Sequence, residues 1–254
     1  MTWRAALLLA VGLATIIAAA LADPVAQDPL YHQFSDRRSF AGVPNFLNVM
    51  SNLPFLFVGV SGLIFVSRHG DTVAPGMKLA WLVFFAGITL TCFGSAYYHL
   101  QPGNEPLVWD RLPMTIGFMS LVAIVVAEYR SARIGAAVLL PLLLIGFASV
   151  MYWSRTELLG VGDLRPYAVV QFLPMLLIPI ALLLFPSRSD LGRYIWMMFG
   201  IYLAAKLFEW FDSDIYAVGE LLSGHSIKHI VASLAPASLL YGLSQRRRSG
   251  QAHG

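Results

Sequence analysis

The chain has 254 residues, of which 57% are hydrophobic and only 12% are charged. A soluble domain usually carries about 25% charged residues. With a mean hydropathy of +0.68, the composition therefore excludes an ordinary soluble enzyme and indicates a membrane protein. The net charge of +3 is small, and its basic residues lie in short loops and the tail, so we expect no nucleic-acid partner. The single cysteine excludes an intramolecular disulfide and a cysteine-based metal cluster.

The first 22 residues have the shape of a signal peptide. Arg4 precedes an apolar run over residues 5–20, which ends in the A-x-A pattern Ala20-Leu21-Ala22. An uncleaved additional transmembrane helix explains the same pattern, and both interpretations stay open. Residues 23–44 are predicted to form a non-cytoplasmic segment.

Seven apolar stretches follow residue 44, and each could form a helix across the hydrocarbon core, which needs about 20 residues. The sequence predicts an all-α, polytopic membrane protein, with a seven-helix transmembrane bundle over residues 45–244 and a basic tail over residues 245–254. Connections rich in Pro, Gly and charge are expected at residues 68–71, 101–104 and 186–190. The helices are expected near residues 45–67, 77–99, 108–128, 134–153, 166–186, 192–211 and 222–243.

The basic residues of the loops predict the orientation of the bundle. One side carries more of them, Arg68, Lys78, Arg130, Arg133, Arg188, Arg193, Arg246, Arg247 and Arg248, and the other carries Arg37, Arg38, Arg111, Arg155 and Arg165. Because loops rich in Lys and Arg stay in the cytoplasm, we expect a multi-pass cell-membrane protein whose C-terminus is cytoplasmic and whose mature N-terminus is outside.

Three of the six histidines are predicted at helix ends. His99 ends the second predicted helix, Asp110 begins the third, and His225 and His229 lie in the first turns of the last. Because neighbouring helices alternate in direction, all four side chains are expected at one level, near the non-cytoplasmic face. The other histidines are expected in loops or in the tail: His32, His69 and His253.

The spacing of these residues favours a catalytic metal site. His225 and His229 are four residues apart, so they share a helix face and can bind one ion together. Ser95 lies four residues before His99 and is expected on the same face. Three imidazoles leave the fourth position of a tetrahedral zinc open, which is the catalytic pattern. Asp110 would move the proton of the attacking water to a leaving amine, and Ser95 would orient the water or stabilise the oxyanion.

Simpler interpretations compete with this one. Two histidines one turn apart on a membrane helix are more often joined by interhelical hydrogen bonds, and His99 at the same depth shifts the balance toward a metal. Haem would require facing histidines with a different spacing. Alone, Asp110 could cap a helix and Ser95 could be a packing residue. Lys206 and Glu209, three residues apart, are predicted to form a structural ion pair rather than a headgroup contact.

Three ordered motifs resemble those of the alkaline ceramidase family. Residues 94–99, G-S-A-Y-Y-H, are followed after ten residues by D-R-L-P-M at 110–114, similar to the family's G-S-x-x-x-H and D-E-L-P-M. Residues 48–52, N-V-M-S-N, resemble its N-x-x-S-N, and residues 225–229 resemble its final H-x-x-x-H. The set spans all seven predicted helices.

This resemblance implies a zinc-dependent intramembrane hydrolase of the CREST superfamily. The substrate would be ceramide or a related N-acyl membrane lipid, cleaved at the amide to a fatty acid and a sphingoid-like base. Zinc would be held by His99, His225 and His229, with Asp110 and Ser95 beside the reacting water. The superfamily also contains receptors and lipid-remodelling proteins. A lipid receptor or an acyltransferase with a retained zinc site is therefore the alternative.

The sequence also departs from the family pattern. Asp36 is the only acid between Tyr31 and Asn45, and Asn45 stands where the family has a glutamate. This argues against dependence on Ca²⁺, which eukaryotic members bind in that stretch. Arg111 replaces the glutamate that follows the aspartate in the family motif. The leader and the compact, Ala-rich chain resemble a bacterial member.

Overall fold

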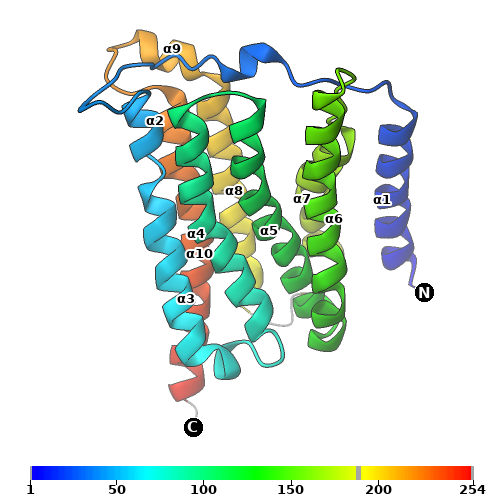
Figure 1. Ribbon diagram of the computed structural model, residues 1–254. Coiled ribbons are helices and arrows are strands. Elements are labelled where there is room, and N and C mark those ends of the chain that lie inside the picture. Colours follow the sequence, from blue (N-terminus) through cyan, green and yellow to red (C-terminus); the bar gives the residue numbers. More distant parts are fainter. Residues whose placement is uncertain (1, 187–189, 253–254) are drawn as a thin grey trace.

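The computed structural model describes residues 2–186 and 190–252, which fold into helices without a β-strand. The helices run alternately up and down through one bundle (Figure 1). In chain order they are α1 (Trp3–Leu21), the 3-10 helix η1 (Pro29–His32), α2 (Phe46–Met50), α3 (Leu53–Val73), α4 (Lys78–Leu100), α5 (Asn104–Tyr129), α6 (Ala132–Leu158), α7 (Arg165–Leu184), α8 (Leu191–Trp210), α9 (Asp212–Ala217) and α10 (Gly224–Ala252).

Six of the described helices are long and apolar enough to cross a membrane. They are α1, the combined α2–α3 stretch, α4, α5, α6 and α7. Helices α8 and α10 are at least as long as α1 but contain more polar residues, and they are outside this group. The length and composition of the six helices indicate a multi-pass integral membrane protein.

The predicted helix positions agree with the structure to within a few residues, with two corrections. The predicted break at residues 68–71 is wrong, because α3 continues to Val73 and ends only before Pro75 and Gly76, whose φ is +73°. Residues 245–252 of the predicted tail are also helical, since α10 continues to Ala252. Within the predicted break at 186–190, residues 187–189 lie outside the described part of the chain.

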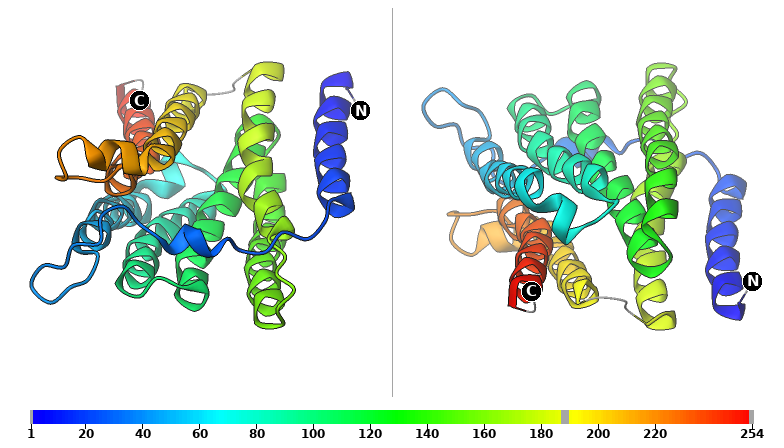
Figure 2. Two further views of the ribbon diagram at one scale, coloured as in Figure 1. Left: turned by 90° about the horizontal axis from the view of Figure 1, so that it is seen from above. Right: turned by 90° about the horizontal axis from the view of Figure 1, so that it is seen from below.

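Helices α3 to α6 pack as sequential antiparallel neighbours, and α10 packs against α3 and α8. Helix α1 lies at the edge of the molecule beside α7 (Figure 2). This position fits a signal peptide and a retained helix equally. The end of the bundle that holds α9 is called the upper end here, and residues 22–45 cross it from α1 to α2 (Figure 1).

Prolines and a serine mark the starts of several helices. Pro54 and Pro166 occupy the first turns of α3 and α7, where a missing N–H costs nothing. The Ser131 hydroxyl accepts a hydrogen bond from the Ile134 amide and caps α6. Such local signals explain why the helix starts were predictable from the sequence.

A close helix contact sets the distance between α4 and α5. At Gly94 an added Cβ would overlap the carbonyl of Trp109. Small residues at such positions let membrane helices approach each other. Because Gly94 precedes His99 and Trp109 precedes Asp110, this contact also fixes the spacing of two candidate site residues.

Gly94→Ala should therefore destabilise the protein by about 1–3 kcal/mol, the usual cost of forcing extra volume into a packed interior. Thermal unfolding of the purified protein in detergent measures the change. Gly200→Ala in α8 is the matched control, because a Cβ there meets nothing within 4 Å. Equal melting temperatures for the two variants would contradict the close-contact explanation.

Candidate metal centre

The structure brings together the three histidines singled out in the sequence. His99 lies in the last turn of α4, and His225 and His229 lie in the first turns of α10. Their side chains are buried, with exposed fractions of 1%, 8% and 4%. The Nε2 atom of His99 is 3.3 Å from that of His229 and 3.4 Å from that of His225. The three side chains form a group that could hold one metal ion.

Asp212 fixes the beginning of α10. Its Oδ1 atom accepts a hydrogen bond from the backbone N–H of His225 at 2.7 Å, and its Oδ2 atom accepts one from the N–H of Ser35 at 3.1 Å. One carboxylate thus anchors a candidate ligand and ties the N-terminal segment to it. The sequence did not indicate this role of Asp212, because the two backbone amides that it accepts from are 13 and 177 positions away in the chain.

The N-x-x-S-N motif contributes a residue that orients a candidate ligand. The Ser51 Oγ atom is 2.8 Å from Nδ1 of His229, and it donates to the Asn48 carbonyl. With the Ser51 hydroxyl donating there, the serine oxygen accepts the Nδ1–H, and Nε2 is left as the free lone pair. Asn48 also accepts from Ser226 and donates to the carbonyl of Asp36. The motif therefore links α2, α10 and the N-terminal segment.

An aromatic ring covers the outer side of the histidine cluster. The Phe34 ring centroid lies 4.6 Å from that of His99 and 4.7 Å from that of His225. Phe34 is itself buried, with 5% exposed. Phe34 therefore packs against two of the three candidate ligands.

One of the three histidines, His229, lines a cavity of about 290 Å³, whereas His99 and His225 do not. Ser95 and Asp110 line the same cavity. Both side chains are buried, with exposed fractions of 3% for Ser95 and 7% for Asp110. The cavity is lined by residues of α3, α4, α5, α7, α8 and α10, and by Gln27 and Tyr31 of the N-terminal segment.

A charged group lies on the far wall of this cavity. Glu209 pairs with Lys206, as predicted, and also with Lys228 of α10 at 3.0 Å. All three residues line the cavity. Two lysines share one carboxylate, so this group carries a net positive charge.

Asp36 and Arg38 form an ion pair within the N-terminal segment, and Arg38 also donates to the Leu221 carbonyl. The Arg38 guanidinium donates to both carboxylate oxygens of Asp36, at 2.9 and 2.8 Å. This contact lowers the pKa of Asp36. Asp36 is the only acidic residue between Tyr31 and Asn45, where the family resemblance would place a calcium site, and its carboxylate is already paired with Arg38. The expectation against calcium dependence stays a prediction.

No protein-family model matches this chain, and no curated protein matches it.

If the cluster is a metal centre, the purified protein should contain about one divalent ion per chain. His225→Ala should remove it, because two imidazoles bind far more weakly than three. Elemental analysis after dialysis measures the content. His32→Ala is the matched control, since His32 bridges Tyr98 and Asn104 outside the cluster. Metal-free folded wild type would contradict the assignment.

Ser51→Ala should weaken metal binding about 10- to 100-fold, the usual effect of removing a partner that orients a ligand. Competition with a chelator of known affinity measures it. Ser244→Ala provides the control, because Ser244 donates only to the Tyr241 carbonyl within α10. An unchanged affinity in Ser51→Ala would show that His229 does not need this hydrogen bond.

Proposed function

We propose that the protein is a zinc-dependent intramembrane hydrolase that cleaves the amide bond of ceramide or a related N-acyl lipid. One observation carries the proposal. His229 of the histidine cluster lines a cavity together with Ser95 and Asp110, and this cavity adjoins an apolar chamber inside a membrane bundle. The motif resemblance to alkaline ceramidases points to the same chemistry.

The spacing of the histidine nitrogens supports zinc as the metal. Zinc–nitrogen bonds of about 2.0–2.1 Å in a tetrahedron place two ligand atoms about 3.3–3.4 Å apart. The two closest Nε2 pairs are 3.3 and 3.4 Å apart. His99, His225 and His229 would hold the ion through Nε2. When bound, zinc would supply a Lewis acid and lower the pKa of a coordinated water.

The apolar chamber supports a lipid substrate. Its volume is about 140 Å³, and it shares part of its wall with the polar cavity: Phe55, Thr91, Met114, Phe118, Tyr202 and Ala232. Along α5 the combined wall extends from Asp110 to Leu121, a distance of about 16 Å at 1.5 Å per residue. A hydrocarbon chain would lie in the chamber while its amide is held at the level of the histidines.

The side chains around the cavity suit amide hydrolysis. Asp110 would accept a proton from the attacking water and pass it to the amine nitrogen as the C–N bond breaks. The Ser95 hydroxyl would donate to the oxygen that becomes negative on the former carbonyl carbon. Asn52 Oδ1 is buried with no hydrogen-bond partner and its residue lines the cavity, so it can accept the amide N–H. The products are a fatty acid and an amine.

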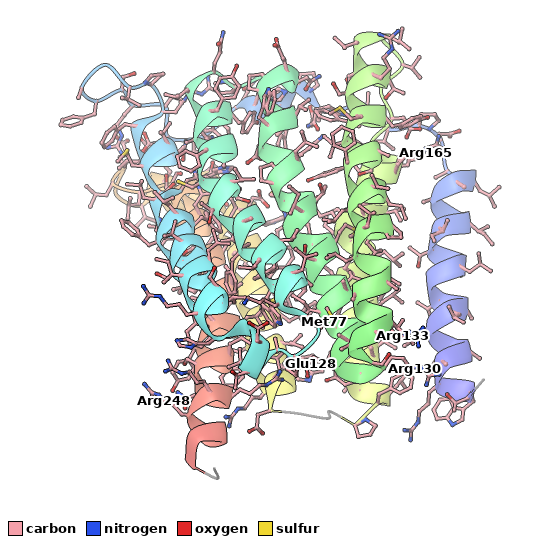
Figure 3. All side chains as sticks on the ribbon, turned by 60° about the horizontal axis from the view of Figure 1, so that its bottom comes forward. Met77, Glu128, Arg130, Arg133, Arg165 and Arg248 are labelled. Atoms are coloured by element: carbon pink, nitrogen blue, oxygen red, sulfur yellow. The ribbon has the colours of Figure 1, made fainter. Side chains whose placement is uncertain are left out.

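In this proposal α3, α4, α5, α6, α7, α8 and α10 are the seven membrane-crossing helices. The upper end would face away from the cytoplasm and the C-terminus would be cytoplasmic. Arg130, Arg133 and Arg248 lie at the lower end, at the opposite end of the bundle from Arg165 (Figure 3). The positive-inside rule favours the cytoplasm for that end.

Asp110→Asn should lower ceramide hydrolysis about 10²- to 10⁴-fold, the usual contribution of a general acid–base residue, while zinc content stays unchanged. Release of fatty acid by purified, zinc-loaded protein measures the rate. Asp214→Asn on α9 is the matched control, because Asp214 is exposed and outside the cavity.

The same assay separates the alternatives. Zinc without turnover of any amide lipid would contradict the hydrolase and favour a receptor. Transfer of the acyl chain to an added alcohol in preference to water would indicate an acyltransferase.

A further inference from the structure

Arg111 is a buried cation on the wall of the cavity, and part of its guanidinium lacks a partner. Its exposed fraction is 5%, and it lines the cavity with Asp110. One guanidinium nitrogen, Nη2, donates to the Gln27 side-chain oxygen at 2.6 Å. The other, Nη1, is buried and has no hydrogen-bond partner among the described residues.

Aromatic rings hold this guanidinium in place without neutralising it. The Cζ atom lies 4.0 Å from the ring centroid of Trp153 and 4.5 Å from that of Tyr167. These cation–π contacts stabilise the cation, and the Gln27 acceptor carries no charge. Tyr31 is the third ring near the guanidinium, with its centroid 6.0 Å from Cζ, and its phenol carries no charge at neutral pH. Within the described chain Arg111 forms no salt bridge.

The other charges of the cavity leave a positive excess. Lys206 and Lys228 share Glu209, and Asp110 is the other carboxylate on the wall. The cavity is thus lined by three cations and two carboxylates. A bound divalent metal would add to this excess. A buried charge without a counter-ion is costly in a membrane protein, and a ligand that brings a negative group would remove that cost.

We propose that Arg111 binds an oxyanion on the amine portion of the substrate, so that the preferred lipid is an anionic N-acyl amide rather than a neutral one. This inference rests on the proposed function and names its substrate class. The position fits, because Arg111 is next to Asp110 in sequence and lies toward the upper end of α5, whereas the apolar chamber for the acyl chain lies deeper. The planar guanidinium fork suits a carboxylate or a phosphate.

Binding is tested with two non-hydrolysable probes that have the same shape. They are the ketone isosteres of N-palmitoylglycine and N-palmitoylglycinamide, in which CH2 replaces the amide N–H. One carries a carboxylate and the other an uncharged carboxamide. Zinc-loaded wild type should bind the carboxylate about 10-fold more tightly or better, the usual gain from a charged hydrogen bond. Calorimetry in detergent micelles gives both dissociation constants.

The variants assign this preference to one side chain. Arg111→Gln should reduce the ratio of the two dissociation constants to within about twofold, and Arg111→Lys should keep part of it. Arg155→Gln, the same change at an exposed position at the end of α6, should behave as wild type. Unchanged zinc content shows that each variant is folded. A preserved ratio in Arg111→Gln overturns the proposal.

A second pair of ligands identifies the anion. Ceramide 1-phosphate and ceramide are compared as competitors of the carboxylate probe. If ceramide 1-phosphate competes more strongly than ceramide, while the carboxylate and carboxamide probes bind equally, the group that Arg111 binds is a phosphate. No preference within either pair overturns the proposal.

Turnover separates this inference from the hydrolase assignment. N-palmitoylglycine and its carboxamide are offered as substrates to the same preparations. Selective binding of the carboxylate probe without hydrolysis of either substrate would contradict the hydrolase proposal but support the anion site at Arg111. Hydrolysis of both at equal efficiency, with equal binding of the probes, would leave the hydrolase and contradict the anion site.

Discussion

The convergence of three imidazole nitrogens inside a membrane bundle is the constraint on which the upper half of the molecule depends. The Nε2 atom of His99 is 3.3 Å from that of His229 and 3.4 Å from that of His225. The lone pairs on these atoms repel each other unless protons or a cation lie between them, and burial strengthens that repulsion. The neighbouring groups hold the rings in this arrangement. Ser51 orients His229, Asp212 anchors the backbone at His225, and Phe34 covers the rings.

The N-terminal segment is part of the site rather than a spacer before the bundle. Phe34 contacts two of the three candidate ligands, the Ser35 amide donates to Asp212, and Gln27 and Tyr31 line the cavity. The segment therefore supplies contacts to the cluster and part of the cavity wall. Excluding bulk water strengthens each electrostatic interaction inside.

The charged residues of the cavity differ in whether a counter-ion within the protein balances them. Lys206 and Lys228 both have Glu209 as a counter-ion, although the group keeps a net positive charge, and this fits a structural role for the Lys206–Glu209 pair. Arg111 instead has aromatic neighbours and one unpartnered nitrogen. The difference explains why Arg111, and not the lysines, is assigned to the ligand.

Local sequence patterns were enough to predict the helical membrane fold, most helix positions and the candidate ligands. Apolar runs of helical length set the helices, and the four-residue spacing of His225 and His229 is a local property of one helix. Which distant residues complete the site follows from how the helices and the N-terminal segment pack. Phe34, Ser51, Asp212 and the unpartnered nitrogen of Arg111 act through contacts between segments far apart in the chain, which no local pattern records. Helix α3 continued past the polar residues 68–71 for a related reason. At a helix end, packing and the first residue that cannot continue the helix decide where it stops, and composition alone does not.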